Sequence, residues 1–172
     1  MKPGDHPDFF RLPPPPGQSR ESGIVLDGTG RFWHKGEPIE HPGMVRAFAS
    51  WLRRHPDDGR YILSNGYDWS YLTVQDAPFF VSAVRLDAEP PRLVLTSGEQ
   101  EPLDPTTLLI GQGDALYVRV KQGAFLAKFS PAAQLTLAPV LVELPDGCVG
   151  IRVADQVFPV NHAVSGPPAG PS

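Results

Sequence analysis

The sequence is poor in cysteine, with Cys148 alone among its 172 residues. A single cysteine cannot form an intrachain disulfide, and it cannot supply a cysteine-based zinc knuckle. Long apolar runs are also missing: no stretch approaches the roughly 20 residues of a membrane-spanning helix. Residues 1–22 lack the apolar run of about 7 to 15 residues that a signal peptide needs. We therefore expect a cytoplasmic protein that does not insert into membranes.

Basic residues are not in excess, and no known catalytic motif is present. The 15 Lys and Arg residues are outnumbered by 19 Asp and Glu residues, which gives a net charge of -4. Nucleic-acid-binding proteins usually concentrate Lys and Arg, so a nucleic-acid partner is disfavoured. The sequence contains no G-x-S-x-G motif, no P-loop and no G-x-G-x-x-G motif after a strand. We expect a protein that is not an enzyme and that needs no cofactor and no metal.

Proline and glycine are abundant, with 21 and 17 copies, and both ends of the chain are rich in proline. Residues 1–22 include the run LPPPPG, and residues 165–172 are again rich in Pro, Gly and Ser. Such composition favours polyproline II or solvated coil over helix and central strand. We predict a disordered proline-rich leader over 1–22 and a disordered tail over 165–172.

Between these ends, the pattern predicts short strands and two helices. The run around DGTG, residues 27–30, has the composition of a hairpin turn. A helix is predicted from about 43 to 54, with Phe48, Trp51 and Leu52 on one buried face and Arg53-Arg54 at its C-terminal end. A second helix is predicted to begin at Ser130-Pro131 and to be shortened or kinked by Pro139.

The two halves of the chain share short motifs in the same order, which suggests an internal repeat. The matched motifs are Gly30-x-Phe32-x-x-Lys35 with Gly123-x-Phe125-x-x-Lys128, His41-Pro42 with Ser130-Pro131, and Val74-x-Asp76-x-x-Phe79 with Val153-x-Asp155-x-x-Phe158. We predict an α+β, β-rich fold of two similar subdomains, residues 23–88 and 89–164. Each subdomain would contain a hairpin, a helix and returning strands.

The stretch GRFWHKGEPIEHPG, residues 30–43, raises the question of a metal site. Its histidines and glutamates are His34, Glu37, Glu40 and His41, which a metal-dependent hydrolase could use. Zinc sites normally need three or four converging ligands, and the second half of the chain has Ala127 and Ser130 at the matching histidine positions. We therefore interpret His34 as an exposed strand residue and His41 as a helix cap, with the hydrolase as the alternative.

Several motifs are similar to those of the bacterial family called domain of unknown function 1285. They include LDGTGRFWHKGEPI, VRAFASWLRR, LTVQDAPFFV, YVRVKQGAFLAKFSPAAQ and VFPV, so the similarity covers roughly residues 23–160. The resemblance implies a fold of repeated motifs and a link to ligand binding or signalling, without known catalytic residues. Family members tend to carry a Thr-Pro-Val-Glu-Lys-like segment where this chain has SNGYDWSY. If that segment contacts the ligand, the ligand differs here or binding is lost.

The expected function is therefore a non-enzymatic small-ligand-binding protein or a regulatory or signalling adaptor. A cleft between the subdomains is the expected site, and its candidate ligand-binding residues are Trp33, Arg46, Tyr117 and Arg119. Ordinary roles for the same residues are half-buried strand positions for the aromatics and solvated or paired charges for the arginines. A structural interaction module using strand edges and the proline-rich leader is a further alternative. Ligand identity and oligomeric state stay open.

Overall fold

The computed structural model describes residues 2–163, and the chain divides into two compact units between Pro78 and Phe79. This division lies ten residues before the boundary at 88 that the repeat suggested. The strand β7 (Phe79–Arg85) pairs with β8 (Arg92–Leu95) and β12 (Phe125–Phe129), so its backbone partners belong to the second unit. The predicted tail, residues 165–172, lies outside the described residues.

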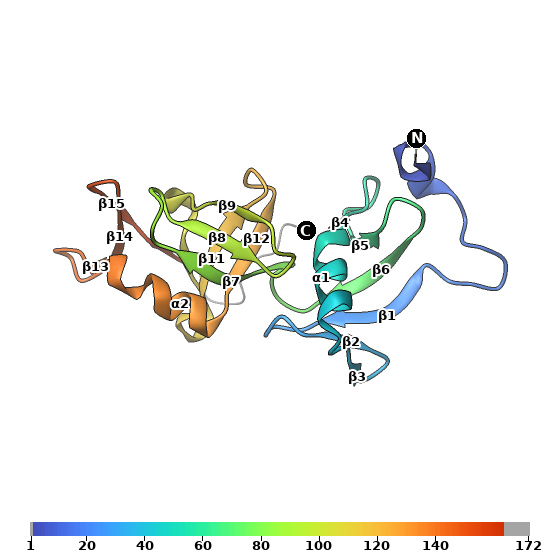
Figure 1. Ribbon diagram of the computed structural model, residues 1–172, viewed down its shortest axis with the longest axis horizontal. Helices are drawn as coiled ribbons and strands as arrows, with labels where there is room; N and C mark the ends of the chain where they lie inside the picture. Colours follow the sequence, from blue (N-terminus) through green and yellow to red (C-terminus); the bar gives the residue numbers. More distant parts are fainter. Residues whose placement is uncertain (1, 164–172) are drawn as a thin grey trace. The chain divides into compact units, whose positions relative to one another are not determined.

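The first unit is built on a six-stranded sheet with the order β3-β2-β1-β6-β5-β4, shown with its labels in Figure 1. The strands are β1 (Glu21–Leu26), β2 (Phe32–His34), β3 (Glu37–Pro38), β4 (Leu52–Arg54), β5 (Tyr61–Ser64) and β6 (Trp69–Val74). Neighbours are antiparallel except β1 and β6, which run parallel. Hairpin turns form at the DGTG run, as predicted, and at Asn65-Gly66, where Gly66 has a positive φ of 86°.

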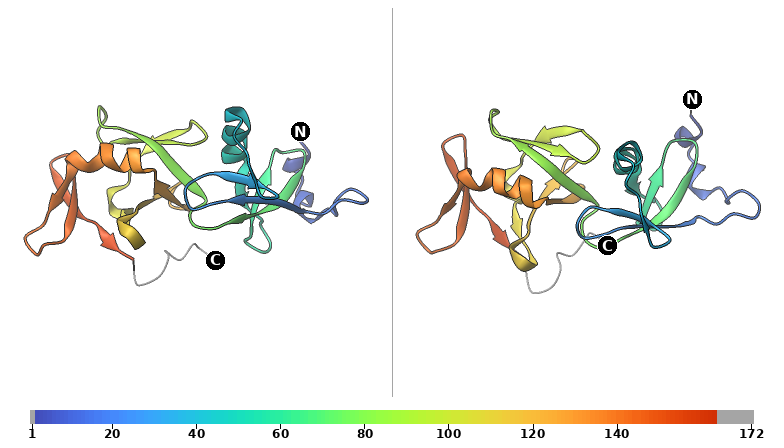
Figure 2. Two further views of the ribbon diagram at one scale, coloured as in Figure 1. Left: turned by 90° about the horizontal axis from the view of Figure 1, so that it is seen from below. Right: turned by 60° about the horizontal axis from the view of Figure 1, so that its bottom comes forward.

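The helix α1 (Pro42–Trp51) covers one face of this sheet in both views of Figure 2. His41 caps it and Pro42 occupies its first turn, as the sequence predicted. The helix ends at Trp51, so the prediction that it reaches residue 54 is wrong. Leu52–Arg54 instead forms β4 and pairs with β5, which satisfies its backbone and buries Leu52. Arg53 and Arg54 are therefore strand residues and do not complement a helix dipole.

Part of the segment 2–22 packs on the first unit, whereas the sequence predicted a disordered leader over 1–22. Two short 3-10 helices, η1 (Pro3–Asp5) and η2 (Phe9–Arg11), precede β1. Phe9 and Phe10 are buried at 4% and 9% exposure, in one cluster with Ile62 and Trp69. Burying two aromatic rings gives this segment an apolar anchor that its proline content did not reveal.

The second unit contains a seven-stranded sheet, ordered β16-β10-β11-β12-β7-β8-β9, and a three-stranded sheet, ordered β13-β14-β15. Its remaining strands are β9 (Gln100–Pro102), β10 (Leu109–Ile110), β11 (Leu116–Val120), β13 (Leu141–Glu143), β14 (Val149–Val153), β15 (Gln156–Pro159) and β16 (Asn161–His162). The helical elements are η3 (Pro105–Thr107), η4 (Gln112–Asp114), α2 (Pro131–Leu137) and η5 (Ala138–Val140). Ser130 caps α2, and the α-helix stops before Pro139, as predicted. Leu93, Val118, Ala127 and Ile151 are fully buried in this unit.

The fold is α+β and β-rich, which confirms the predicted class, but the repeat remains a hypothesis. The first motif forms an antiparallel hairpin in each half, β1–β2 and β11–β12. The third motif differs between the halves. Phe79 begins β7 in the second unit, whereas Asp155, at φ 64°, forms the tight turn of the β14–β15 hairpin. None of the helices among the described residues is long and apolar enough to cross a membrane.

Candidate functional site

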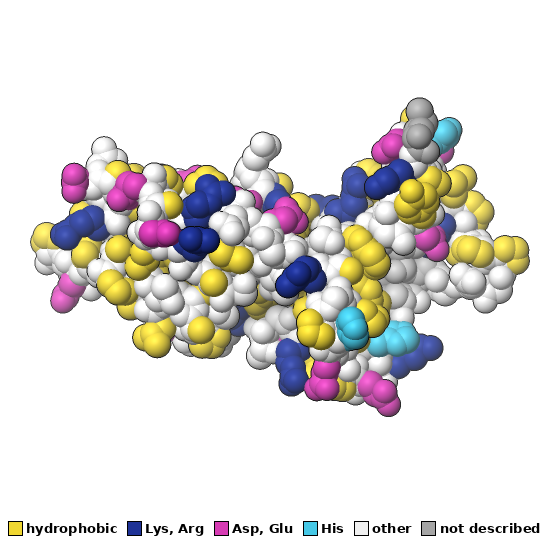
Figure 3. Space-filling view, in the orientation of Figure 1, with side chains coloured by type: hydrophobic (Ala, Val, Ile, Leu, Met, Phe, Trp, Pro, Cys, Tyr) yellow, Lys and Arg dark blue, Asp and Glu magenta, His cyan; other side chains and the backbone are white. Residues whose placement is uncertain are grey.

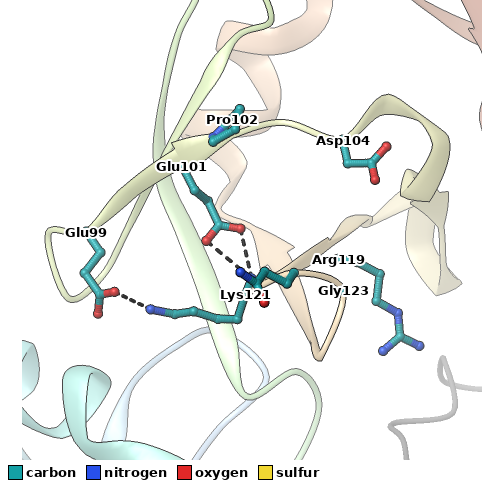
Figure 4. Close-up of a pocket in the computed structure, with 8 residues that line it drawn as sticks. Glu99, Glu101, Pro102, Asp104, Arg119, Lys121 and Gly123 are labelled. Carbon is teal, nitrogen blue, oxygen red and sulfur yellow. Dashed lines mark hydrogen bonds and ion pairs between the residues drawn. The ribbon is translucent and has the colours of Figure 1, made fainter.

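A polar cavity of about 610 Å³ in the second unit is the best candidate for a functional site (Figure 4). Its volume is within the range of roughly 300 to 1,000 Å³ that is usual for small-molecule sites. Residues of β9, of the end of β11 and of the β11–β12 turn surround it. The lining residues are Glu99, Glu101, Pro102, Asp104, Arg119, Lys121, Gln122 and Gly123.

The cavity forms where β11 extends beyond its short neighbour β10. The two residues of β10 pair only with Leu116 and Tyr117, so the rest of this edge of β11 has no strand partner among residues 2–163. Side-chain oxygens accept hydrogen bonds from the backbone N–H groups of this edge instead. The N–H of Arg119 donates to Thr107 Oγ1 at 3.1 Å, and that of Lys121 donates to Glu101 Oε1 at 3.0 Å. These bonds hold η3 and β9 beside β11 and define two walls of the cavity.

The β11–β12 turn, which forms another wall, has an uncommon backbone conformation. Lys121, Gln122 and Gly123 have positive φ angles of 56°, 59° and 82°. Glycine adopts such angles readily, but non-glycine residues pay a steric cost there. Backbone of this kind is often found at binding sites, where the surrounding structure holds it in place.

The carboxylates of the cavity are all engaged within the chain. Glu99 forms an ion pair with Lys121 Nζ and accepts a bond from Ser97 Oγ at 3.2 Å. The Lys121 hydrogen bond lowers the pKa of Glu99, and burial only partly opposes this effect. Asp104 Oδ1 accepts from the N–H and the hydroxyl of Thr106, at 3.1 and 2.6 Å. These carboxylates therefore hold the cavity walls together.

Arg119 differs from the other charged residues of the cavity. Its guanidinium makes no hydrogen bond or ion pair with residues 2–163, although its backbone is fixed by Thr107. Figure 4 shows its side chain extending away from Glu99 and Glu101. A guanidinium carries five N–H donors in one plane, which suits recognition of a carboxylate or phosphate group. Arg119 is therefore the residue best placed to bind an anionic ligand.

The other candidate residues from the sequence have different surroundings. Trp33 is half-buried and its Nε1 donates to Asp27 Oδ2 at 2.8 Å, which braces the β1–β2 hairpin. Arg46 is exposed on α1 of the first unit. Tyr117 lies two residues before Arg119 on β11, but it is only 3% exposed. Of the four candidates, Arg119 is the one that lines this cavity, and ligand binding by any of them stays a prediction.

Most residues of the cavity could not be predicted from the sequence. Glu99, Glu101 and Asp104 come from the segment GEQEPLD, and Lys121 and Gln122 from the turn VKQGA. The acidic cluster was visible in the sequence, but exposed acidic residues are common and its partner strand is about 20 residues away. Only the folding of β9 beside β11 brings these groups together.

The histidine stretch has structural contacts. His41 Nδ1 accepts from the N–H groups of Gly43 and Met44, at 3.1 and 3.3 Å, so it caps α1 as predicted. His34 is exposed on β2, as predicted, and it faces Glu37 across the β2–β3 pair. Glu40 forms an ion pair with Arg31 at 3.7 Å. Within the described part of the chain, no group of three or more His, Cys, Asp and Glu side chains could hold a metal ion.

A second hollow, in the first unit, is smaller and is lined in part by large apolar side chains. Its volume is about 160 Å³, and its lining includes Ile24, Phe48, Trp51 and Leu63. Hydrophobic side chains gather over α1 in Figure 3, and Met44 on this helix is 46% exposed. A hollow of this size is below the usual volume of small-molecule sites. The cavity beside Arg119 therefore remains the better candidate.

Comparisons with known proteins agree on one family. Residues 14–77 match the N-terminal domain of DUF1285, a domain of unknown function. A DUF1285 family protein from Silicibacter pomeroyi DSS-3 has a similar structure, with a TM-score of 0.66, 22% identity and coverage of 94% of this chain and 90% of that one. For a DUF1285 family protein from Shewanella baltica OS155, the TM-score is 0.55, the identity 18% and the coverage 70% and 94%. No curated protein matches the sequence significantly.

Proposed function

Because residues 14–77 match the N-terminal domain of DUF1285, a domain of unknown function, we propose the role of this chain from the cavity of its second unit. The protein is a non-enzymatic small-ligand-binding protein, and its ligand is a small organic anion held by Arg119. The protein acts in the cytoplasm, and binding of the ligand there has a regulatory or signalling role. The observation that carries this proposal is the guanidinium of Arg119, which lines the cavity without a bond to any described residue.

The carboxylates of the cavity support a ligand with hydrogen-bond donors besides its anionic group. Asp104 uses Oδ1 for Thr106, and Glu101 directs both oxygens toward the N–H of Lys121. Each carboxylate oxygen has two lone pairs, so acceptor capacity remains beside the cavity. A ligand with hydroxyl or amino groups would use this capacity, whereas a purely anionic ligand would meet repulsion. The favoured ligand class is a small carboxylic acid with hydroxyl or amino substituents.

The composition of the lining supports binding rather than catalysis. Among the described residues, the lining contains no histidine, cysteine or serine, and its three carboxylates are engaged by groups of the chain itself. Lys121 forms an ion pair with Glu99, so its ammonium group is held within the wall of the cavity.

A thermal-shift screen with small hydroxy and amino carboxylic acids tests the proposal. A ligand present at 100 times its Kd stabilises a folded protein by about 2.7 kcal/mol, which raises its melting midpoint measurably. We expect at least one such acid to stabilise the wild type and not Arg119→Met, which keeps the aliphatic stem. Arg152→Met is the control, because Arg152 is an exposed strand residue that does not line the cavity. The proposal is contradicted if an acid stabilises Arg119→Met as much as Arg152→Met. It is also contradicted if no acid stabilises the wild type.

A further inference from the structure

The N-terminal segment, residues 3–11, is docked on the first unit like a bound peptide. Phe9 and Phe10 form one buried cluster with Ile62 and Trp69, the ring of Phe10 also contacts that of His55, and Tyr71 packs against the cluster. We call His55, Ile62, Trp69 and Tyr71 the aromatic notch. Ile62 is fully buried, and His55 and Trp69 are 6% and 7% exposed. The ring of Phe10 lies 6.1 Å from that of Trp69 and 6.0 Å from that of His55. The segment thus fills an aromatic site on the sheet.

Three consecutive residues of the segment are each contacted by a polar group of the unit. Trp69 Nε1 donates to the carbonyl of Phe9 at 3.3 Å. The next carbonyl, that of Phe10, lies 2.8 Å from His55 Nε2. His55 Nδ1 accepts from the N–H of Asp57 at 3.1 Å, so Nε2 carries the proton and donates.

The third residue is bound through its side chain. The guanidinium of Arg11 makes two bonds to the carboxylate of Asp57, at 3.0 and 2.9 Å. Such a paired arrangement fixes orientation as well as charge. The guanidinium of Arg53 lies over the ring of Phe10, 4.7 Å from its centroid. Side chains and main chain of Phe9-Phe10-Arg11 are therefore both recognised, which is how peptide-binding sites achieve specificity.

The docked segment is joined to β1 by an exposed proline loop, residues 12–17. Leu12 has φ -69° and ψ 140°, the polyproline II conformation, and it is 53% exposed. The run ends in a turn, where the N–H of Gln18 donates to the carbonyl of Pro15 and Gly17 has φ 77°. Figure 1 shows this loop projecting from the unit. The family match begins at residue 14, so the docked segment lies before it, while the whole notch lies within it.

We propose that the aromatic notch is a peptide-recognition site for a Phe-Phe-Arg segment, and that it accepts the N-terminal segment of a second copy of this chain in exchange for its own. The contacts of residues 3–11 with the notch are non-covalent, and a second copy carries the same groups. Exchange of an identical element between copies is a low-cost route to assembly. The segment already bound in the notch therefore defines the chemistry of the occupant.

The proline loop, residues 12–17, links each N-terminal segment to its own first unit. This link explains why the unexchanged single chain is the favoured form. A short linker gives a docked segment an effective concentration of about millimolar, so a free segment at micromolar concentration competes poorly. We expect the wild type to bind an added peptide at least tenfold more weakly than a chain whose own segment has been disabled. The site is therefore closed in the single chain and open to a partner when its own segment is lost.

A complementation experiment with full-length chains tests the exchange. The first variant, Phe9→Ala with Phe10→Ala, keeps the notch and disables the segment. The second, Asp57→Asn with His55→Phe, keeps the segment and removes two of its polar partners. We expect a 1:1 heterodimer by sedimentation when the two are mixed at tens of micromolar, and no dimer from either variant alone. A mixture that stays monomeric overturns the exchange between copies.

A synthetic peptide of residues 3–13, PGDHPDFFRLP, tests the site itself. We expect it to bind the first variant, with a change in tryptophan fluorescence, and to displace the second variant from the heterodimer. The matched control peptide has alanine at both phenylalanine positions. If the first variant is unfolded alone, restoration of its circular dichroism spectrum by the peptide supports the site. Absence of both binding and restoration overturns it.

Discussion

At the scale of single residues, Asp27 organises the β1–β2 hairpin. Its carboxylate accepts four hydrogen bonds, from the N–H and hydroxyl of Thr29, the N–H of Arg31 and Nε1 of Trp33, at 2.7 to 3.0 Å. Burial raises the pKa of Asp27, but the bonds from Trp33, Thr29 and Arg31 outweigh it and lower the pKa to about 2. The charged form of Asp27 therefore stabilises the folded state.

This pKa predicts a loss of stability in acid. The pKa in the folded state lies below that of the unfolded chain, so the contribution is complete above about pH 4 and is lost as the pH falls toward about 2. After allowance for solvent screening, we expect a loss on the order of 1 to 2 kcal/mol. Urea melts of the wild type and Asp27→Asn from pH 7 to 2 should converge in acid. Asp146→Asn is the control, because Asp146 is exposed and accepts a bond from Cys148. Parallel pH curves for the wild type and Asp27→Asn would contradict the assignment.

At the scale of elements, Trp51 and Trp69 of the first unit have different environments. Trp69 on β6 is 7% exposed, and its Nε1 donates to Phe9. Trp51, at the end of α1, is only half-buried, although the sequence predicted it in the core. Its ring lies 5.7 Å from that of Phe48, and both border the smaller hollow. The aromatic face of α1 is thus partly open to solvent.

Replacing these tryptophans by alanine should separate the two environments. Loss of a fully buried Trp side chain costs about 3 to 5 kcal/mol, which we expect for Trp69→Ala. For Trp51→Ala we expect roughly 1 to 2 kcal/mol, because part of its surface is already in water. Chemical denaturation of both variants measures the difference. A larger loss for Trp51 than for Trp69 would mean that α1 packs more tightly than the structure indicates.

The capping role of His41 gives a second prediction about α1. Serine is a good N-cap, so His41→Ser should change stability little, whereas His41→Ala should cost about 0.5 to 2 kcal/mol. His34→Ala, at an exposed strand position, should be mild. We also expect no stoichiometric zinc in the purified protein and no shift of its melting midpoint by a chelator. One zinc per chain, lost together with stability in the double variant His34→Ala with His41→Ser, would favour the hydrolase alternative.

The elements predicted from the sequence are those with local chemical causes. The caps at His41 and Ser130 and the turn at Asp27 depend on residues within a few positions of one another. The end of α1 was missed because β4 forms through pairing with β5, a contact that helix periodicity does not contain. Phe9 and Phe10 were missed because two adjacent aromatics have no period. Their burial depends on contact with Trp69, whose Nε1 donates to the carbonyl of Phe9 although the two residues are 60 positions apart in the sequence.

At the scale of the whole molecule, each unit has its own sheet and its own buried core. The first contains the six-stranded sheet with Leu26, Phe32 and Ile62 buried, and the second contains the other two sheets. The boundary was misplaced in the sequence because Phe79–Arg85 follows the first half without a strong linker signal. In the structure, this strand is β7 and lies between β12 and β8. The order of the strands in the sheet determines where the second unit begins, and this order could not be predicted from the sequence.

Fragments cut at the two alternative boundaries test this division. We expect residues 79–172 to fold cooperatively, because they retain every strand of the seven-stranded sheet. Residues 89–172 lack β7, which joins β12 to β8, so β8 and β9 lose their connection to the rest of the sheet. They also lose the buried side chains of Phe79, Phe80 and Val81. Thermal melts followed by circular dichroism should show a sharp transition for the first fragment and none for the second. Cooperative melting of residues 89–172 would instead place β7 with the first unit.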